Sequence, residues 1–393
     1  MSDLCTQTFA DLAARLGFSC ETAGGLVAVR SPFGLENWTL PVLEITVIAG
    51  AVLALVYAII RLRRHRDPTN LVLWFGAIAY LLIIEPPLYF PGPFGISDHV
   101  DTMFAHNLFT VDFLWGRLPL YIVAIYPMMA TVAYEIVRIL GVFARYGVLV
   151  GAICVGFVHH VFYEIFDHIG PQLRWWEWTL DHPMNQPFFD SVPLPSVVVF
   201  AALWPMSLAF FVQLFVGRHA ASGKTFTGVE LVWRTIAVGI LASIGTAILP
   251  LPATVGGSLS GSTAVGGLIY AIELVVVAIV AIPVLAGQWW RLRHRSGDEP
   301  VTARYTNPLI LRYAAVYLVV MTVLWITALP DYFGAVDGTT SNGDPIGSLW
   351  YALACLIVAG LSVAAAATAT PGTRRDDAPA LDDALSGHGP VND

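Results

Sequence analysis

Residues 156–168 hold three histidines and two carboxylates inside an apolar stretch long enough to cross a lipid bilayer. Ionisable side chains in such a stretch are costly, since an acid at the centre of a membrane helix costs about 2.5–3.5 kcal/mol on insertion scales. A cluster of them is therefore a hypothesis for a functional site. Carboxylates and imidazoles support two kinds of chemistry, proton transfer and metal binding.

The spacing of these side chains predicts one polar stripe on a helix. His160, Glu164, Asp167 and His168 follow one another at intervals that keep them on one side, whereas His159 points about 100° away. The interpretation we prefer is proton chemistry, in which Glu164 or Asp167 is a buried acid that donates a proton and His160 tunes it. The structural alternative is a set of helix-end residues hydrogen-bonded to neighbouring helices.

A divalent metal ion is the alternative cofactor, and otherwise no cofactor is predicted. Imidazole and carboxylate groups one helical turn apart can reach the same ion, which makes His160, Glu164 and His168 the candidate ligands. The sequence lacks a His-Glu-x-x-His spacing that would favour a metal more strongly. Further candidate ligands lie in the predicted outer loops: His99, His106 and His182.

Three more acids lie in apolar segments. Glu85 precedes Pro86-Pro87, and these prolines are expected to interrupt the helix. Glu85 is interpreted either as a second acid or water-orienting base of the site, or as a helix-end residue whose side chain reaches the membrane interface. Glu273 lies too deep in its segment for simple exposure and is a candidate substrate-binding residue. Glu135 is interpreted as a helix-surface partner of Arg138.

An aromatic loop follows the polar stripe. Trp175, Trp176 and Trp178 fit an aromatic belt at the membrane interface, or a lid that shields an apolar substrate and stabilises a transient cation. Arg174, beside them, is a candidate ligand for an anionic headgroup. We take all four as candidate substrate-binding residues.

The elements that position these residues are membrane helices. The chain has 393 residues, of which 56% are hydrophobic and 12% charged. With about 20 apolar residues per crossing, we expect an all-α integral membrane protein with about nine transmembrane helices. The expected spans lie near residues 42–60, 71–90, 118–140, 146–166, 195–216, 231–251, 267–286, 309–329 and 348–367.

Basic residues predict the orientation, because short cytoplasmic loops retain Lys and Arg. An outside N-terminus and an inside C-terminus place 16 of the 20 basic residues on the cytoplasmic side. The outer side keeps Arg15, Arg30, Arg117 and Arg174. The protein is therefore expected to be a multi-pass membrane protein in which any His and carboxylate site opens toward the outer leaflet.

Three regions are expected along the chain. Residues 1–40 form an extracytoplasmic cap, in which Asp3–Phe18 is an amphipathic helix on the membrane surface. Cys5 and Cys20 form either a disulfide, which needs the chain to fold back near Gly17, or two unpaired thiols. Residues 41–368 form the transmembrane domain, as one anchor helix and four helical hairpins, and residues 369–393 form a disordered cytoplasmic tail.

Several functions find no support in the sequence. No basic domain suggests nucleic-acid binding, so membrane lipids and an apolar small molecule are the expected partners. The single lysine, Lys224, lies in a predicted cytoplasmic loop and argues against a retinal Schiff base. A proton-coupled transporter or a non-catalytic assembly protein remains an alternative, although the ionisable groups gather on the outer side instead of lining a path through both leaflets.

Residues 167–216 resemble the integral-membrane carotenoid hydratases of the bisanhydrobacterioruberin-hydratase type. The residues that carry this resemblance are Asp167, Gly170-Pro171, Trp176-x-Trp178, Phe188-Phe189, Val192-Pro193-Leu194 and the aromatic span after them. The chain departs from that family by an extra residue before Val192, by Asp190-Ser191 in place of glycine, and by additional spans. The whole chain also resembles a family of multi-spanning actinobacterial membrane proteins that carries no assigned activity, through Leu35–Trp38 and Glu85–Phe90.

The resemblance implies protonation of an isoprenoid double bond followed by capture of water, without a redox cofactor. The residues suit that chemistry independently, because an alkene-protonating hydratase or cyclase needs a buried acid, aromatic walls and access from lipid. We therefore expect a membrane enzyme of the hydratase or cyclase type, with Glu85, His160, Glu164 and Asp167 as candidate catalytic residues.

Overall fold

The computed structural model describes residues 4–97, 100–180, 182, 185, 187–294 and 305–369. Among the residues singled out in the sequence, His99 lies outside this part of the chain. The predicted cytoplasmic tail also lies outside it, apart from Ala369.

Nine helices of the described residues are long and apolar enough to cross a membrane, in agreement with the predicted number. The protein is a multi-pass helical membrane protein. The crossing segments are α2 (Thr39–His65), α3 (Thr69–Tyr89), α4 (Leu120–Ile139), α5 (Val142–Ile169), the segment Ser196–Ala221, the segment Gly228–Ser260, α10 (Thr263–Arg293), α11 (Pro308–Phe333) and α12 (Leu349–Ala369).

Two of these segments are composite. The segment after α5 is built from the π-helical stretch η4 (Ser196–Leu203), α6 (Trp204–Val212), a second π-helical stretch η5 (Gln213–Gly217) and α7 (Arg218–Ala221). The segment Gly228–Ser260 consists of α8 (Gly228–Ile248) and α9 (Leu251–Ser260), with Pro250 between them. Proline lacks the amide N–H that a continuing helix needs, which explains the division between α8 and α9.

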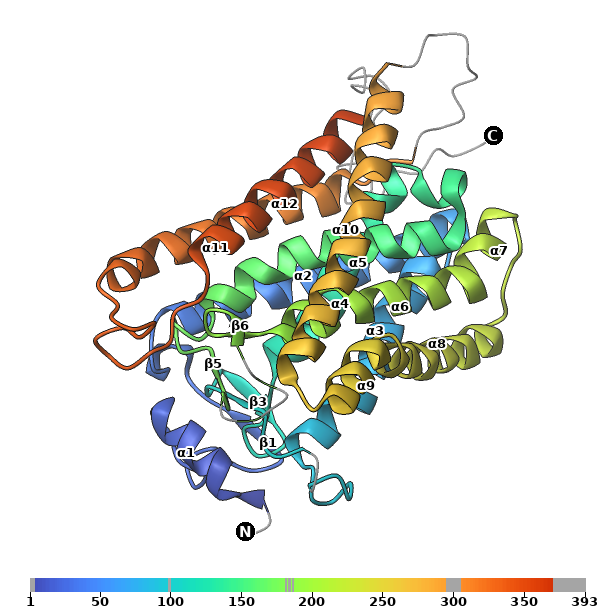
Figure 1. Ribbon diagram of the computed structural model, residues 1–393. Coiled ribbons are helices and arrows are strands. Elements are labelled where there is room, and N and C mark those ends of the chain that lie inside the picture. The colour runs from blue at the N-terminus through green and yellow to red at the C-terminus, as the bar shows by residue number, and fades with distance from the viewer. Residues whose placement is uncertain are drawn as a thin grey trace.

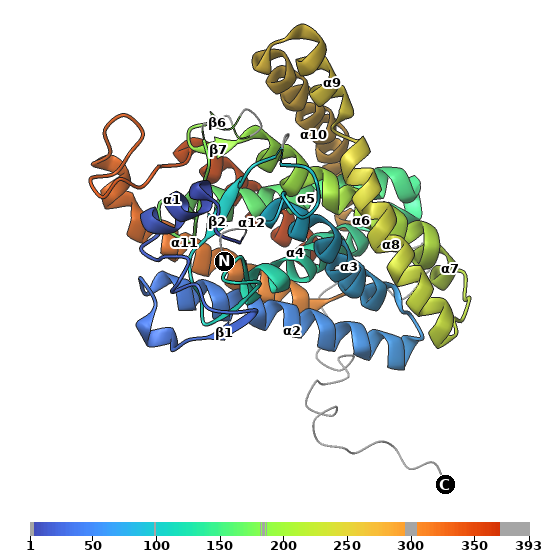
Figure 2. The same ribbon diagram turned by 90° about the horizontal axis from the view of Figure 1, so that it is seen from below.

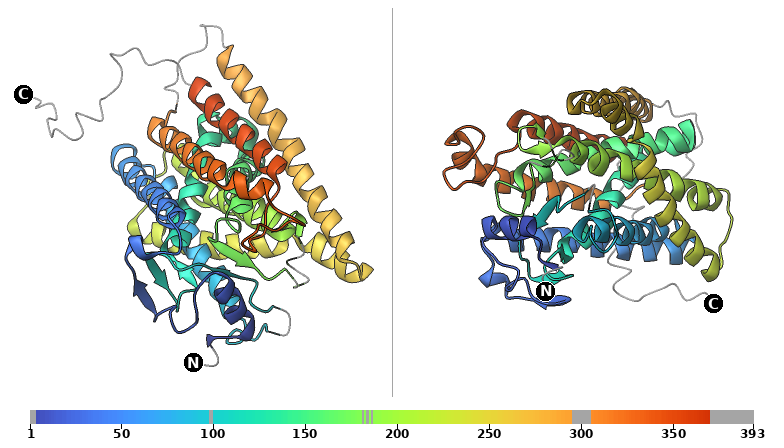
Figure 3. Two further views of the ribbon diagram at one scale, coloured as in Figure 1. Left: turned by 90° about the vertical axis from the view of Figure 1, so that its left-hand side faces the viewer. Right: turned by 60° about the horizontal axis from the view of Figure 1, so that its bottom comes forward.

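Helices α4 and α5 form the centre of the bundle (Figures 1 and 2). Nearly every residue of α4 is buried, and α5 is buried along most of its length. The outer helices α8, α10, α11 and α12 instead expose leucine, isoleucine and valine side chains, as lipid-facing helices do. Figure 3 (left) shows α11 and α12 side by side, with α10 next to them.

The expected arrangement in hairpins holds for three of the four pairs. Helix α3 packs on α4, α5 packs on α6, and α11 packs on α12. The third pair differs, because α8 packs against α3 and α6 and is joined to α10 through α9.

A small cap covers one end of the bundle, and we call this end the cap end and the opposite end the far end. The cap consists of α1, the strands β1 to β5 and their connecting segments, and lies near the N-terminus (Figure 1). Its elements are α1 (Gln7–Arg15), β1 (Val27–Val29), the short 3-10 helix η2 (Pro32–Gly34), β2 (Phe104–His106), β3 (Val111–Phe113), β4 (Leu118–Pro119) and β5 (Trp176–Trp178).

The cap strands join loops that are distant in sequence. β3 pairs antiparallel with both β1 and β4, and β2 pairs antiparallel with β5. The register of the second pair sets His106 opposite Trp176 and Phe104 opposite Trp178. A separate two-stranded pair, β6 (Pro187–Phe189) with β7 (Val192–Pro193), precedes η4.

The N-terminal amphipathic helix is present, but protein covers its apolar face. Phe9, Leu12 and Leu16 of α1 are at most 2% exposed and pack with Ala105 of β2. The prediction that this face lies on the membrane surface is therefore wrong. The apolar stripe that suggested lipid contact serves instead as the core of the cap.

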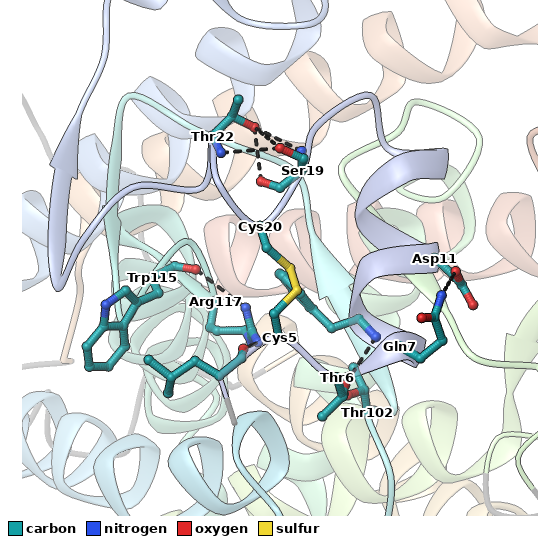
Figure 4. Close-up of a disulfide and its surroundings, with 12 residues drawn as sticks. Cys5, Thr6, Gln7, Asp11, Ser19, Cys20, Thr22, Thr102, Trp115 and Arg117 are labelled. Carbon is teal, nitrogen blue, oxygen red and sulfur yellow. Dashed lines mark hydrogen bonds between the residues drawn. A yellow bond between two sulfur atoms is a disulfide. The ribbon is translucent and has the colours of Figure 1, made fainter. Parts of the chain in front are cut away.

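Cys5 and Cys20 form a disulfide, so the first of the two alternatives is confirmed (Figure 4). Their α-carbons are 6.2 Å apart, because the chain folds back between them through Gly17, which has a φ of 88°. Glycine adopts this left-handed conformation at no steric cost. The two remaining cysteines, Cys154 and Cys355, are buried and free.

A buried polar network joins the helix ends at the far end. Asp67 accepts hydrogen bonds from Arg61 and Arg138. Arg138 also donates to Asn70. Glu135 accepts from Asn70 at 2.9 Å and also from Asn307 and Tyr305.

Glu135 has no exposed side-chain surface. The interpretation of Glu135 as a helix-surface partner of Arg138 is therefore wrong, although the two lie 3.8 Å apart. Its carboxylate holds α3, α4 and the start of α11 together. The spacing of three residues to Arg138 suggested a surface pair, but it could not show that two other segments cover this side of α4.

The disulfide predicts a cap that is sensitive to reduction. Replacing both Cys5 and Cys20 with serine removes a cross-link spanning 15 residues. Loop-closure entropy makes such a link worth about 3 kcal/mol. In the full-length protein in detergent, we expect faster amide hydrogen exchange in residues 4–23 and unchanged exchange in α4.

A reducing agent is the control for this double variant. It should speed exchange in the cap of the unmodified protein and have no further effect on the variant. Unchanged exchange in the unmodified protein after reduction would contradict the disulfide.

Candidate functional site

A buried cavity of about 50 Å³ lies between the cap and the bundle. It has room for a few water molecules, since each needs roughly 10–15 Å³ of such volume. We call it the acid cavity. Its polar lining residues are Glu85, His106, Tyr126, His159, Tyr163 and Asp167. Its other lining residues are Phe104, Ile122, Ile125, Phe166, Trp176, Trp178, Phe200 and Trp204.

Glu85 reaches the acid cavity from the last turns of α3. The helix continues through Pro86 and Pro87 to Tyr89, so the expected interruption at the prolines is wrong. Glu85 is 3% exposed, which rules out a helix end that reaches the interface. The hydroxyl of Tyr126 donates to Oε1, while Oε2 has no hydrogen-bond partner among the described residues.

Asp167 reaches the same cavity from α5. Its side chain is fully buried, and Oδ2 accepts a hydrogen bond of 2.8 Å from Ser196 at the start of η4. Within the part of the chain that is described, Oδ1 has no partner. Each of the two acids that line the cavity thus has one buried oxygen without a protein partner among the described residues.

His159 presents an unprotonated nitrogen to the acid cavity when its ring is neutral. Its Nδ1 lies 2.7 Å from the carbonyl oxygen of Ala201 in η4. A carbonyl only accepts, so the proton sits on Nδ1 and Nε2 is left with a free lone pair. His159 lines the cavity, and this lone pair is a candidate proton acceptor there.

His106 completes the imidazole groups of the acid cavity from strand β2. Burial lowers the pKa of His106 to about 3, so the ring is neutral at physiological pH. Its Nδ1 hydrogen-bonds with the hydroxyl of Tyr121 at 3.1 Å. The sequence suggested His106 only as a further metal ligand in an outer loop, and the structure places it in the cavity wall.

Helix α5 carries two polar stripes instead of the single stripe predicted. His159, Tyr163 and Asp167 line the acid cavity, whereas His160 and His168 flank Glu164 outside the lining of that cavity. The prediction that Asp167 belongs with Glu164 and that His159 is isolated is wrong. Residue 167 lies about 60° around the helix from residue 164 and about 40° from residue 163, so it falls between the two stripes, and the packing of the neighbouring helices decides which side it joins.

The second stripe is a buried cluster that faces α12, in which neither carboxylate oxygen of Glu164 has a hydrogen-bond partner among the described residues. Glu164 lies 3.5 Å from Nδ1 of His160 and 3.2 Å from Nε2 of His168. His160 also contacts the carbonyl of Val197 through Nδ1 and the hydroxyl of Tyr351 through Nε2. His160, Glu164 and His168 lie on α5 and are buried, whereas Tyr351 of α12 is partly exposed.

The second stripe does not fit a metal ion as it is arranged. Both ring nitrogens of His160 contact protein groups, and Nδ1 of His168 accepts the backbone N–H of Ser348 at 2.9 Å. Glu164 and one nitrogen of His168 remain, fewer than the three protein ligands of a catalytic zinc site. In the part of the chain that the structure describes, no group of three or more His, Cys, Asp or Glu side chains could hold a metal ion.

The three tryptophans are buried, and Trp176 and Trp178 line the acid cavity whereas Trp175 does not. Trp175 is fully buried, stacks on Phe166 and donates from Nε1 to Thr39 at 2.8 Å. Trp176 and Trp178 are 2% and 8% exposed and line the acid cavity from β5. The aromatic-belt interpretation is therefore wrong, because a belt places its indoles at the membrane interface.

Trp178 also borders a second space on its other side. It lines a surface hollow of about 550 Å³ in the cap, together with Asp11, Asp101 and Glu177. Glu177 lies between the two tryptophans on β5 and forms an ion pair with Arg15 of α1 at 2.5 Å. Successive strand residues point to opposite faces, which explains why the tryptophans and Glu177 face different ways.

Two other predicted site residues lie outside the lining of the acid cavity. Arg174 forms ion pairs with Asp344 at 2.7 Å and with Glu36 at 3.2 Å, so its guanidinium is held by carboxylates of the protein. Glu273 lies on α10, and both of its carboxylate oxygens are buried without a hydrogen-bond partner among the described residues. The structure brings Glu85 and Asp167 together but leaves Glu164 and Glu273 out of that lining.

Comparison of the chain with protein-family models, with curated proteins and with solved structures gives no match.

Close packing of α5 on η4 positions both histidines and predicts the effect of one substitution. A β-carbon at Gly156 would lie 2.7 Å from the carbonyl oxygen of Ala202. Gly156→Ala must therefore push η4 away from α5. We expect the free energy of unfolding to fall by about 1–3 kcal/mol, as measured by denaturant unfolding in detergent.

Gly360→Ala on α12 is the matched control, because nothing lies within 4 Å of a β-carbon there. This change should leave stability unaltered or raise it by roughly 0.5–1 kcal/mol through helix propensity. Equal effects of the two substitutions would contradict the close contact at Gly156.

Proposed function

We propose that this protein is a membrane enzyme that protonates a carbon–carbon double bond of an apolar, isoprenoid-like lipid, in the manner of a hydratase or cyclase. The observation that carries the proposal is the convergence of Glu85, Asp167 and His159 on one aromatic cavity. The resemblance to actinobacterial membrane proteins favours a bacterial plasma membrane as the location, and the distribution of arginines favours the outer side for the cap.

Asp167 is the proposed proton donor. Among the described residues, neither lysine nor arginine lines the acid cavity. Ionising a carboxyl there would leave a buried charge without a counter-ion, and keeping the proton avoids that cost. The hydroxyl of Ser196 holds one oxygen of Asp167 and leaves the other directed at no protein group.

His159 is the proposed proton acceptor, and Glu85, which the same argument keeps protonated, is proposed to orient the water molecule. Protonating an alkene carbon generates a carbocation at the neighbouring carbon, and the oxygen of a water molecule then bonds to that carbon. The water loses a proton to Nε2 of His159, and transfer of that proton back to Asp167 restores the starting state. The sum is one alkene and one water giving one tertiary alcohol.

The aromatic walls suit the cationic intermediate. The rings of Tyr126 and Trp204 lie 5.0 Å apart between centroids, and Trp176 and Trp178 close the cavity on the cap side. Ring faces attract cations, by about 2 kcal/mol or more where water is excluded. Such walls stabilise a carbocation without providing a nucleophile that would capture it.

The size of the cavity limits what part of a substrate enters it. A volume of about 50 Å³ is far below that of pockets that enclose a whole ligand, which span about 300–1,000 Å³. The acid cavity therefore suits the end of an apolar chain, with the remainder of the lipid outside it.

The resemblance to carotenoid hydratases supports the same proposal. The segment 167–216 supplies Asp167, Trp176, Trp178, Phe200 and Trp204 to the cavity lining. The resemblance and the cavity thus concern the same stretch of chain.

The proposal predicts that two acids on α5, Asp167 and Glu164, differ in their importance for the hydration rate. Asp167→Asn should slow hydration of an isoprenoid alkene by about 10²–10⁴-fold, the contribution of a general acid. Glu85→Gln should slow it in the same direction. The measurement is uptake of isotopically labelled water by a panel of isoprenoid alkenes, followed by mass spectrometry, with purified protein in lipid vesicles.

Glu164→Gln is the matched control, since Glu164 is equally buried on the same helix but does not line the acid cavity. This variant should keep most of the rate. Loss of activity in Glu164→Gln with full activity in Asp167→Asn would assign the chemistry to the other stripe.

Removal of metal tests the alternative cofactor. If proton chemistry is correct, protein dialysed against a chelator should retain its hydration rate, and added divalent ions should not raise it. A rate that disappears on dialysis and returns with one metal would favour a metal-dependent enzyme.

A further inference from the structure

A second, larger cavity lies at the far end of the bundle, away from the acid cavity. Its volume is about 660 Å³, and four arginines line it: Arg138, Arg145, Arg218 and Arg291. We call it the basic cavity. Among the described residues that line it, none is an aspartate or glutamate.

The four arginines differ in how they are held. Arg138 is engaged by Asp67 and Asn70 in the polar network of the far end. Nε of Arg291 donates to Gln288 at 3.0 Å. Arg145 and Arg218 are exposed, and neither forms an ion pair with a carboxylate of the described chain. Two guanidinium groups at one opening therefore have their charge available for an anion.

The backbone of α5 adds to the positive potential. Helical geometry is broken at Gly147, with φ 81° and ψ −174°, and the helix resumes at Val148, which lines the basic cavity. The first amide groups of a helix lack carbonyl partners and carry a partial positive charge. This start of the helix at Val148 lines the same cavity as the arginines and, like them, favours an anionic ligand.

The basic cavity also has apolar lining residues, beside polar ones such as Thr69 and Gln213. Ile139, Phe143, Val148 and Leu292 line it next to the arginines. Its volume falls within the range of about 300–1,000 Å³ that encloses small ligands. A site lined by both guanidinium groups and apolar side chains is complementary to an amphiphile.

We propose that the basic cavity binds the phosphate headgroup of an anionic amphiphile. Arg145 and Arg218 would hold the phosphate oxygens, since guanidinium groups pair with phosphate through two parallel hydrogen bonds. The apolar walls would contact the first part of the lipid chain. This site is separate from the acid cavity and does not depend on the proposed hydration activity.

Lipid retention on the full-length protein tests the proposal. The purified protein in neutral detergent is incubated with dioleoyl phosphatidic acid or dioleoyl phosphatidylcholine, and bound lipid is measured by native mass spectrometry. We expect phosphatidic acid to bind more tightly. Arg145→Gln with Arg218→Gln should weaken that binding by about 10- to 30-fold, as expected for two interfacial arginines worth about 1 kcal/mol each.

Arg63→Gln with Arg64→Gln is the matched control. Both residues are exposed at the same end, on α2, and neither lines the basic cavity. This double variant removes the same charge and should change binding by less than about twofold. Equal losses in the two double variants, or equal retention of both lipids, would overturn the proposal.

Two further measurements complete the test. Ala144 lines the basic cavity, so Ala144→Phe should reduce binding by filling space without changing the charge. Inorganic phosphate distinguishes the source of the anion. Competition by millimolar phosphate alone would support a soluble phosphate ligand in the same site, whereas phosphatidic acid that resists this competition would support a lipid. Unaltered lipid binding by Ala144→Phe would place the lipid elsewhere and contradict the proposal.

Discussion

The constraint on which the structure depends is the burial of ionisable side chains on α5. Polar groups in an apolar environment cost several kcal/mol each when they have no partner. His159 and His160 avoid this cost because their rings form hydrogen bonds with the carbonyl oxygens of Ala201 and Val197, which lie one turn apart on η4. A π-helical stretch winds more widely than an α-helix, and such stretches are frequent at functional sites. The contact between α5 and η4 therefore fixes the tautomers of both rings and separates the two polar stripes.

The acid cavity joins two parts of the molecule that would otherwise be independent. The bundle supplies Glu85, His159 and Asp167, and the cap supplies His106, Trp176 and Trp178. Pairing of β2 with β5 brings the cap residues together, and α1 packs against β2. The N-terminal helix α1 thus supports the cap side of the acid cavity, because α1 packs on β2 and β2 pairs with β5. At the far end, the carboxylates of Asp67 and Glu135 connect the ends of several helices by accepting hydrogen bonds from them.

Length and hydropathy were sufficient to predict nine crossings, because the bilayer sets the length of every apolar helix. Clustered ionisable residues also predicted the position of the site along the chain. The side on which Asp167 lies could not be predicted, since residue 167 falls between the two stripes and the neighbouring helices decide. The spacing of His159, Tyr163 and Asp167 is a signal for the stripe that lines the acid cavity, but this stripe is visible only when a tyrosine is counted together with the ionisable residues. The roles of His106 and of the buried tryptophans depend on the pairing of β2 with β5, a contact between loops about 70 residues apart that no local pattern reveals.

The position of Trp178 has a consequence for the wall between the acid cavity and the hollow of the cap. Its indole borders the buried cavity on one side and the hollow of the cap on the other. One aromatic ring thus lines both spaces. A change in the torsion angles of that side chain alters the wall between them. Such side-chain motion is faster than the collective rearrangement of a helix bundle.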